Sequence, residues 1–283
     1  LETLSHTFFA IIHGLIFHKS AVWLIFNAAN GPLLIIPWLF RVKMAINTDG
    51  LEWKRDKWGK IGKCYYQIAE WVSTKLVKNI ITDNKKINEY YANRWSKKSK
   101  TIEYGAYIEE STNKAVLKDF NIEQDKYFLQ ITRLEPDNNP LLSVEAYLRY
   151  IKQNPKSNHK LVIIGDVTYP STYSKKIKSF QNDNIIIPGP VFEKNTLKEL
   201  RTNCFAYIHG NQVGGTNPAL LEAMGSGAFV IARDVSFNRE VLGNGGIYYE
   251  RKTNDLANKM DWVWKNSKKR NKSIDFSINK INN

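Results

Sequence analysis

The sequence predicts an α/β fold built from two doubly wound domains, and three features carry this prediction. Short β-rich apolar runs alternate with helical stretches along most of the chain, which is the pattern of parallel sheets covered by helices. The 283 residues, 43% of them apolar, are enough for two domains with separate cores. A polar, charged stretch at residues 107–126 separates two halves. We therefore expect one domain over residues 1–122 and a second over residues 123–283.

The first half predicts three strands with helices between them. The strands read VWLIFN, KMAINT and NIITDN, at residues 22–27, 43–48 and 79–84. From Ser20 to Phe40 the chain runs 21 residues without a charge, about the length of a membrane span. That run holds residues that would strand polar or backbone groups in lipid, namely Asn27, Asn30, Gly31, Pro32 and Pro37. We interpret it as a buried strand, AVWLIFNAAN, followed by a Pro-started helix, GPLLIIPWLF, with a true span as the alternative.

The second half alternates more regularly. Its strands read KYFLQI, KLVIIG, NIIIPG, CFAYIH and AFVIAR, at residues 126–131, 160–165, 184–189, 204–209 and 228–233. Its helices read PLLSVEAYLRYIKQ, STYSKKIKSFQ, TLKELRTN and PALLEAMGSG, at residues 140–153, 171–181, 196–203 and 218–227. Ligands of such doubly wound sheets bind at the carboxyl ends of the strands, so the segments that follow the strands are the candidate sites.

A glycine-rich loop and a helix start follow the CFAYIH strand. Pro218 suits the first position of a helix, and Asn217 is then its N-cap. Gly214 and Gly215 let the backbone approach a ligand closely, and the helix start offers free N–H groups to an anion. Glu222 lies one turn inside the helix among apolar residues, where a carboxylate needs a hydrogen-bond partner. The stretch indicates a phosphate cradle with a carboxylate for hydroxyl groups; a plain glycine turn before a core helix is the alternative.

Two more segments that follow strands carry candidate residues. Arg133 would project from a strand end to hold phosphate oxygens, with a structural ion pair to Glu135 as the alternative. The segment NTDGLEWKRDKWG, residues 47–59, combines two Trp residues with charged side chains that include Asp49, Glu52, Lys54 and Arg55. Acid, base and flat apolar faces suit a sugar or its lipid carrier, and a charged helix start with Trp in the core is the alternative. His209 is a further strand-end residue, either a ligand contact or a structural histidine.

Composition limits the partners. The formal charge of +14 favours anionic partners such as nucleotides or anionic lipids. No nucleic-acid partner is expected, because no RNA-binding signature or helix-turn-helix accompanies the charge. No Asp-x-Asp and no His/Cys/carboxylate cluster occurs in the sequence, so neither a metal nor a cofactor is expected. Cys64 and Cys204 are too few for a disulfide framework, and without an evident signal peptide we expect a cytoplasmic protein.

Four motifs, taken in order, resemble one enzyme family. DGLEWKRDKWG, RLEPDNN, GGTNPALLEAMGSG and FNREVLG together resemble the bacterial rhamnosyltransferase-type branch of family 4 glycosyltransferases. The resemblance implies the GT-B fold, in which two Rossmann-like domains face each other across a cleft, with the acceptor side in the first domain and the donor side in the second. It also implies metal-independent, retaining transfer of a sugar from a nucleotide diphosphate, such as dTDP-rhamnose. The acceptor would be a surface polysaccharide or a lipid-linked oligosaccharide, with peripheral contact at the inner face of the membrane.

The resemblance also assigns residues. Arg133 would hold the donor diphosphate, backbone amides from Gly214 to Asn217, through Gly215 and Thr216, would cradle it, and Glu222 would bind the ribose hydroxyls. Asn138 stands where the broad family has a diphosphate-binding Lys, which leaves Arg133 with more of the charge. Asp49 is the candidate catalytic or sugar-contacting residue. The acceptor would be seated by Glu52, Lys54 and Arg55.

Three departures from the broad family accompany these assignments. Gly214 stands where that family has a second Glu, and Tyr107 stands where it has an Asp. The first residues resemble a helix well inside the family's first domain, and the last residues, INKINN, stop short of the family's usual closing helix. We therefore expect a fragment truncated at both ends, whose incomplete first domain exposes a sheet edge and apolar surface. A nucleotide-binding remnant with weak catalysis and a nucleotide-sugar epimerase of the same fold are the alternatives to a glycosyltransferase.

Overall fold

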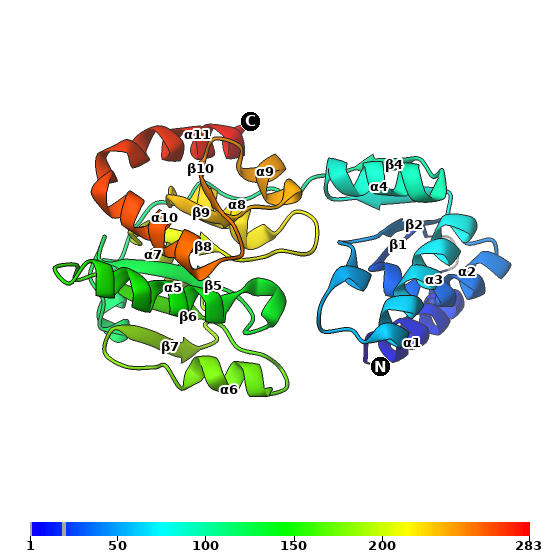
Figure 1. The fold of residues 1–283 in the computed structure, drawn as a ribbon. Helices are drawn as coiled ribbons and strands as arrows, with labels where there is room; N and C mark the ends of the chain where they lie inside the picture. The colour runs from blue at the N-terminus through cyan, green and yellow to red at the C-terminus, as the bar shows by residue number, and fades with distance from the viewer. Residues whose placement is uncertain (1, 19–20) are drawn as a thin grey trace. The chain divides into compact units, whose positions relative to one another are not determined.

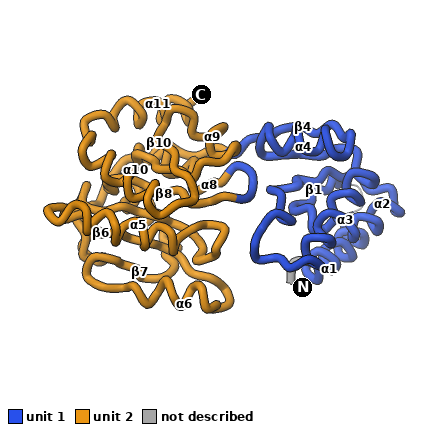
Figure 2. Tube along the Cα trace, viewed as in Figure 1, with its two compact units in different colours: residues 1–104, 213–216 blue, residues 105–212, 217–283 orange. Residues whose placement is uncertain are grey.

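The computed structural model describes residues 2–18 and 21–283. The chain forms two compact units, which Figure 2 draws in different colours. Unit 1 comprises Leu1–Tyr104 with Val213–Thr216, and unit 2 comprises Gly105–Gln212 with Asn217–Asn283. Each unit holds a sheet of parallel strands. The predicted α/β class is therefore confirmed.

Unit 1, drawn mainly in blue to cyan in Figure 1, is built around a four-stranded parallel sheet in the order β1-β2-β3-β4. Its strands are β1 Trp23–Phe26, β2 Met44–Asn47, β3 Asn79–Thr82 and β4 Ser99–Thr101. Its α-helices are α1 Glu2–Phe17, α2 Ile35–Leu39, α3 Lys60–Leu76 and α4 Lys85–Trp95, and its 3₁₀ helices are η1 Ala28–Leu34 and η2 Glu52–Lys54. The three strands expected from the sequence are confirmed. Strand β4 was not expected, because its three residues, SKT, carry no apolar pattern.

The uncharged run folds into short elements from Trp23 to Leu39; its first residue, Ser20, lies outside the described residues. The helix expected to start at Pro32 begins earlier, because the Asn27 side chain accepts a hydrogen bond from the nitrogen of Ala29 at 2.9 Å and so caps η1. Pro32 then lies inside η1, and α2 follows. Within residues 2–18 and 21–283, no helix is long and apolar enough to cross a bilayer.

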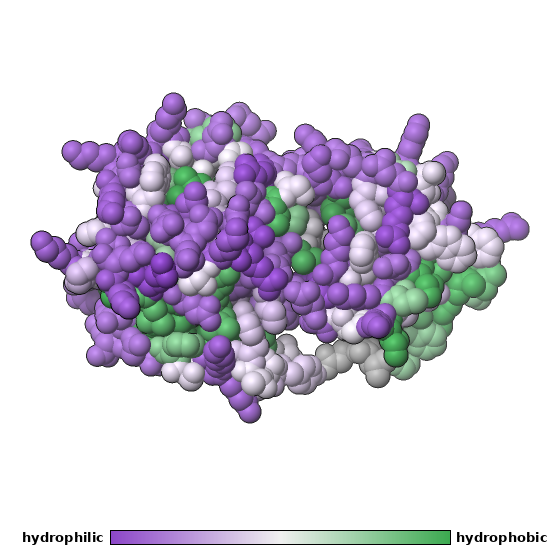
Figure 3. Space-filling view, viewed as in Figure 1, coloured by the Kyte–Doolittle hydropathy of each residue, from purple (hydrophilic) through white to green (hydrophobic). Residues whose placement is uncertain are grey.

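Unit 1 exposes a large amount of apolar side chain around α1, β1 and α2. Strand β1 is at the edge of the sheet, and its Leu24 and Phe26 are 52% and 55% exposed, so the interpretation of this strand as buried is wrong. Phe9 and Phe17 of α1 and Leu39 of α2 are more exposed still. Figure 3 shows a green, hydrophobic area over the part of unit 1 that holds α1 and α2. The expected exposed sheet edge and apolar surface are thus confirmed.

Unit 2 holds a six-stranded parallel sheet in the order β10-β9-β8-β5-β6-β7. Its strands are β5 Tyr127–Ile131, β6 Lys160–Ile164, β7 Ile185–Gly189, β8 Ala206–His209, β9 Val230–Arg233 and β10 Gly246–Tyr249. Its α-helices are α5 Pro140–Gln153, α6 Thr172–Lys178, α7 Lys194–Thr202, α8 Pro218–Gly225, α9 Ser236–Leu242, α10 Thr253–Lys265 and α11 Arg270–Asn282. Its 3₁₀ helices are η3 Lys114–Phe120, η4 Pro136–Asn138 and η5 Ser267–Lys269. All five strands expected here are present, and β10 is additional.

Helices cover both faces of this sheet. Alternate residues of β5 point into different cores, with Phe128 in one and Leu129 in the other. The core that includes Phe128 is completed by α5, α6 and α10, and the core that includes Leu129 by η3, α7, α8 and α9. The chain runs from β5 to β6 and β7 on one side, and then to β8, β9 and β10 on the other. The topological switch point therefore lies between β5 and β8.

The polar stretch before β5 belongs to unit 2, whereas the sequence places the domain boundary after residue 122. Leu117 and Ile122 are buried in the same core as α7 and α8. The nitrogen of Glu109 donates to the carbonyl oxygen of Gly225 at 3.0 Å. Because these contacts tie residues 105–122 to unit 2, the units divide between Tyr104 and Gly105.

Candidate functional site

Helix α8 begins as the sequence predicts. The Asn217 side-chain oxygen accepts a hydrogen bond from the nitrogen of Ala219 at 2.9 Å, and Pro218 occupies the first helical position. The N-cap prediction is confirmed. The apolar residues around Glu222 are buried, but the Glu222 side chain is 46% exposed. The sequence indicated that this carboxylate needs a partner without identifying it. In the structure the partner is Arg201, whose Nη1 lies 3.1 Å from Glu222 Oε2.

The loop before α8 is divided between the units. Val213–Thr216 is grouped with unit 1, whereas Asn217 and Glu222 belong to unit 2. Gly214 has a φ of 134°, a backbone conformation that favours glycine. The binding of a phosphate by the backbone of Gly214, Gly215 and Thr216 stays a prediction.

The loops after β5 and β8 are joined at the switch point. The carbonyl oxygen of Asn138 accepts from Gln130 Nε2 at 2.9 Å, and Asn139 Nδ2 donates to the carbonyl oxygen of Gly210 at 2.8 Å. A Cβ on Gly210 would lie 2.0 Å from the Asn138 oxygen, so only glycine fits there. These contacts fix the backbone at the carboxyl ends of the two strands that flank the switch point.

Arg133 lies directly after β5 at this edge. Its side chain is 54% exposed, and its Nη1 is 3.6 Å from Glu135 Oε1. The ion pair that the sequence offered as the alternative is therefore present, but it leaves half of the side chain accessible. Asn138 is 2% exposed, and its Nδ2 donates to the carbonyl oxygen of Arg133 at 3.1 Å. Asn138 thus stabilises the loop that carries Arg133, and a contact of either residue with a donor stays a prediction.

His209, at the end of β8, is an interior residue. It is 2% exposed, and its ring stacks on that of Tyr207 at 6.4 Å between centroids. Burial lowers the pKa of His209 to about 3, so the ring is neutral at physiological pH. The structural role considered for this residue agrees with its position.

The candidate residues of unit 1 follow β2. Asp49 has a φ of 57° and an exposed side chain whose Oδ1 accepts from the nitrogen of Gly50 at 2.9 Å. Glu52 Oε1 lies 2.8 Å from Arg55 Nη1, with both side chains largely buried. Lys54 Nζ lies 5.4 Å from the centroid of the Trp53 ring. Because Glu52 and Arg55 are paired with each other, their local role is structural, and their contact with an acceptor stays a prediction.

Unit 2 also contains a pocket that the sequence did not indicate. It measures about 520 Å³ and is lined by side chains that include Tyr107, Glu109, Lys194, Leu197, Arg201 and Glu222. Of these, only Glu222 was selected as a site residue from the sequence. Arg201 was missed because it lies in an ordinary helical pattern, and its partners are 92 and 21 residues away along the chain. The pocket combines two carboxylates with two cationic side chains and an aromatic ring.

The chain matches two family models. The model described as "Glycosyl transferases group 1" matches residues 113–280, which is more than half of the chain. The model described as a domain of unknown function, DUF1972, matches residues 38–107. The first match contains the unit 2 elements from η3 to α10 and the candidate residues Arg133, Asn138 and Glu222.

Comparison with individual proteins agrees with these matches. The O-antigen chain mannosyltransferase RfbU of Salmonella typhimurium is 24% identical over 190 residues, which are 66% of this chain and 51% of the relative. The chain thus spans about half the length of this curated relative. The sucrose-phosphate synthase of Thermosynechococcus elongatus has a TM-score of 0.79 at 13% identity, over 99% of this chain and 73% of the other. Anabaena HepE in complex with UDP and glucose has a TM-score of 0.76 at 14% identity, over 91% and 72%. At these identities the solved structures show the fold alone.

Proposed function

This chain belongs to the group 1 glycosyl transferases, and on that premise we propose that it transfers a sugar from a nucleotide diphosphate sugar to a carbohydrate acceptor. The observation that carries the proposal is the arrangement of the edge of unit 2 at its switch point. There the exposed Arg133 follows β5, and α8 with its Glu222 follows β8. Ligands of doubly wound sheets bind at this edge, and Arg133 and the α8 start are both suited to anionic oxygens.

We assign the donor roles accordingly. Arg133 holds the diphosphate, the N–H groups from Gly214 to Asn217 cradle it, and Glu222 accepts hydrogen bonds from the ribose hydroxyls. Asn138 supports the Arg133 loop through its hydrogen bond to the Arg133 carbonyl oxygen. In unit 1, Asp49 is the proposed sugar-contacting residue, because its carboxylate is exposed directly after a strand. Glu52, Lys54 and Arg55 are the proposed acceptor-side residues.

The finer chemistry is proposed from the motifs. The four motifs resemble rhamnosyltransferases of family 4. We therefore propose that rhamnose is transferred from dTDP-rhamnose with retention of its anomeric configuration, without a metal or cofactor. The curated relative is a mannosyltransferase, so mannose is the sugar to test against rhamnose. Transfer from dTDP-rhamnose and from GDP-mannose, each with and without EDTA, tests sugar and metal together. Transfer from GDP-mannose alone would replace rhamnose in the proposal, and loss of transfer in EDTA would refute the metal-free mechanism.

A surface polysaccharide or lipid-linked oligosaccharide is the proposed acceptor, reached by peripheral contact with the cytoplasmic face of a membrane. The formal charge of +14 and the exposed apolar residues of α1 and β1 support this contact. Sedimentation with vesicles tests it. The protein is expected to sediment with vesicles that contain an anionic lipid but not with neutral vesicles. Failure to sediment with either kind would refute the membrane contact.

Nucleotide binding is the first test of the donor site. Calorimetric titration with dTDP, UDP and GDP is expected to give binding of at least one, and Arg133→Ala and Glu222→Ala are expected to weaken it about tenfold each, since a hydrogen bond to a charged group contributes roughly 1.5–3 kcal/mol. Arg149→Ala is the matched control, because Arg149 is exposed on α5. Binding without transfer would favour the nucleotide-binding remnant. If the folded chain binds none of the three diphosphates, the donor site is refuted.

A further inference from the structure

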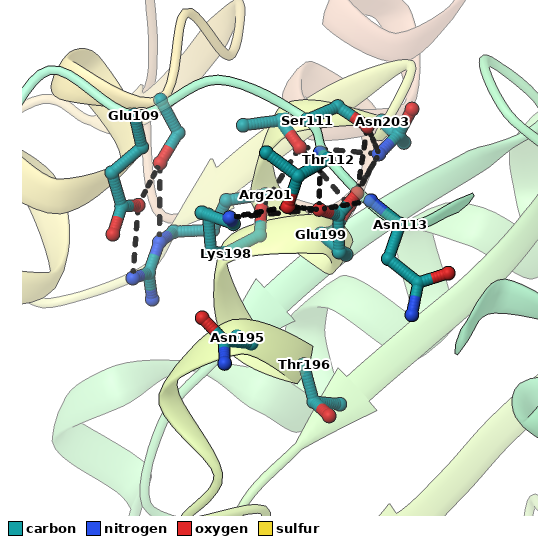
Figure 4. A network of polar contacts seen from close by, with 12 residues as sticks. Glu109, Ser111, Thr112, Asn113, Asn195, Thr196, Lys198, Glu199, Arg201 and Asn203 are labelled. Atoms are coloured by element: carbon teal, nitrogen blue, oxygen red, sulfur yellow. Dashed lines mark hydrogen bonds and ion pairs between the residues drawn. The ribbon is translucent and has the colours of Figure 1, made fainter. Parts of the chain in front are cut away.

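Arg201 connects three parts of unit 2. It lies on α7 and is 5% exposed. Its Nη1 lies 3.1 Å from Glu222 Oε2 of α8, its Nη2 lies 3.4 Å from Glu109 Oε2, and its Nε lies 3.4 Å from Ser226 Oγ. Figure 4 shows the contacts that join Arg201 to Glu109. Because a guanidinium group is planar, partners for all three kinds of nitrogen fix its orientation.

Glu109 is itself held in place. Its nitrogen donates to the carbonyl oxygen of Gly225, and its Oε2 accepts from Ser226 Oγ at 2.7 Å. The backbone here lies close to α8, since a Cβ on Gly225 would be 2.2 Å from the carbonyl oxygen of Tyr107. Glu109 therefore anchors one end of the Arg201 guanidinium to a rigid part of unit 2.

Glu222 is the less constrained partner. Its side chain is 46% exposed at the rim of the pocket that Tyr107 and Lys194 also line. Within the described part of the chain, Arg201 is the polar partner that the structure gives the Glu222 carboxylate. This contact uses Oε2, so Oε1 remains to accept a hydrogen bond from a hydroxyl group.

We propose that Arg201 is a positioning residue that holds the Glu222 carboxylate in the orientation in which it accepts hydrogen bonds from the ribose hydroxyls of the donor. The proposal rests on the donor role given to Glu222 above. Arg201 does not touch the nucleotide in this arrangement. It restricts a long, half-exposed side chain to one orientation, so that the nucleotide does not have to order it on binding.

The test compares a nucleotide that has ribose hydroxyls with one that lacks them. The probes are the nucleoside diphosphate of the dTDP, UDP and GDP panel that binds most tightly and its 2′,3′-dideoxy counterpart. UDP and GDP carry both the 2′ and the 3′ hydroxyl, dTDP carries the 3′ hydroxyl alone, and the dideoxy forms carry neither. For the normal nucleotide, Arg201→Met is expected to lower affinity about tenfold, in line with loss of a charge-assisted hydrogen bond, and Arg201→Lys is expected to restore part of it. For the dideoxy nucleotide, Arg201→Met is expected to change affinity by less than about twofold, within the scatter of remote substitutions. Equal losses for the two nucleotides would mean a merely structural role and would overturn the proposal.

A double substitution separates this proposal from the proposed function. Once Glu222→Gln is present, Arg201→Met is expected to cause no further loss, because the two residues act through one contact. Additive losses would overturn the positioning role. If Glu222→Gln leaves the preference for the normal over the dideoxy nucleotide unchanged, the donor role of Glu222 fails. If Glu222→Gln removes that preference and Arg201→Met does not, only the role of Arg201 fails.

Lys198→Met is the matched control. Lys198 is a second cationic residue of α7, and its Nζ donates to Thr112 Oγ1 at 2.8 Å (Figure 4). It contacts the same segment before β5 without contacting Glu222. The control is expected to leave the affinity for both nucleotides unchanged. A loss confined to the normal nucleotide in Lys198→Met would show that any change in α7 alters the ribose contact, which would also overturn the specific role of Arg201.

Discussion

The carboxylate of Glu199 lies 2.6 Å from the backbone nitrogen of Thr112, which is 87 residues earlier in the sequence. Glu199 also accepts from Ser111 Oγ, the nitrogen of Asn113 and Asn203 Nδ2 (Figure 4). The residue is fully buried, and burial alone would raise its pKa, but these hydrogen bonds outweigh that effect and lower the pKa to about 2. The segment that follows Tyr104 is thereby fixed to α7.

Glu199→Gln is predicted to destabilise unit 2 by roughly 2–3 kcal/mol at pH 7, because the charged acceptor is lost and an amide N–H₂ group faces backbone donors. The folded-state pKa lies below the ordinary value of 4.5, so the stabilisation by Glu199 is fully present above pH 4.5 and is lost as the pH falls toward 2. Urea denaturation of both chains at pH 6 and pH 3.5 is the measurement. The difference in free energy of unfolding between Glu199→Gln and the natural chain is expected to be smaller at pH 3.5.

Glu193→Gln serves as its control. Glu193 is exposed at the start of the same helix, where it accepts from the nitrogens of Asn195 and Thr196. Its replacement is expected to cost less than about 1 kcal/mol, as for other exposed helix caps. Similar losses for Glu199→Gln and Glu193→Gln would contradict the special role of the buried carboxylate.

The sequence predicted the local chemistry of α8 because that chemistry is encoded by neighbours. Asn217, Pro218 and the glycines stand within a few residues of one another, and a cap or a turn depends on little else. Glu199 and Arg201 could not be assigned in this way. Both occupy TLKELRTN, which has the composition of an ordinary charged helix, and their roles depend on partners that the tertiary fold supplies.

The strands show the same difference between features encoded by neighbouring residues and features that depend on the tertiary fold. Strands with an apolar run, such as KLVIIG, were identified from the sequence. Strand β4 was missed because it is an edge strand of three polar residues, which the pairing of Ile81 with Lys100 places in the sheet. Strand β10 was missed because glycines precede it and interrupt the apolar pattern.

Asn217→Ala is predicted to destabilise the start of α8 by about 1 kcal/mol, because the nitrogen of Ala219 loses its partner. Asn217→Ser retains a capping oxygen and is expected to behave like the natural chain. Hydrogen exchange of the α8 amides is the measurement. Equal protection of these amides in both variants would show that the cap contributes nothing.

Glu70 predicts a pH-dependent stability of unit 1. It is 1% exposed on α3, and its Oε2 accepts from the Tyr90 hydroxyl at 2.7 Å. Burial is the main cause that raises the pKa of Glu70, and the net value is about 7. Because the folded state retains a proton that the unfolded state has released, stability is full below pH 4.5 and declines as the pH rises through 7.

As the pH rises from 5 to 8, the free energy of unfolding of Glu70→Gln is therefore expected to increase by roughly 2–3 kcal/mol relative to that of the natural chain, since each pKa unit corresponds to about 1.4 kcal/mol. The amide oxygen of Gln can still accept from Tyr90, so the fold is retained. Urea denaturation across this range, with the exposed Glu89→Gln of α4 as control, is the measurement. A difference between Glu70→Gln and the natural chain that does not change with pH would rule out titration of Glu70 in this range.

Gly210→Ala tests the contact between the loops after β5 and β8. The added Cβ would lie 2.0 Å from the carbonyl oxygen of Asn138 and 2.8 Å from Gln130 Nε2, so the two loops must separate. A loss of about 1–3 kcal/mol of stability is expected, as for other overpacked sites, together with weaker binding of the diphosphate that Arg133 is proposed to hold. Gly59→Ala is the control, because Gly59 has a φ of −69° and nothing lies within 4 Å of an added Cβ. Thermal unfolding and calorimetric titration of both variants are the measurements, and a Gly210→Ala chain as stable as Gly59→Ala would mean that the loops do not make this contact.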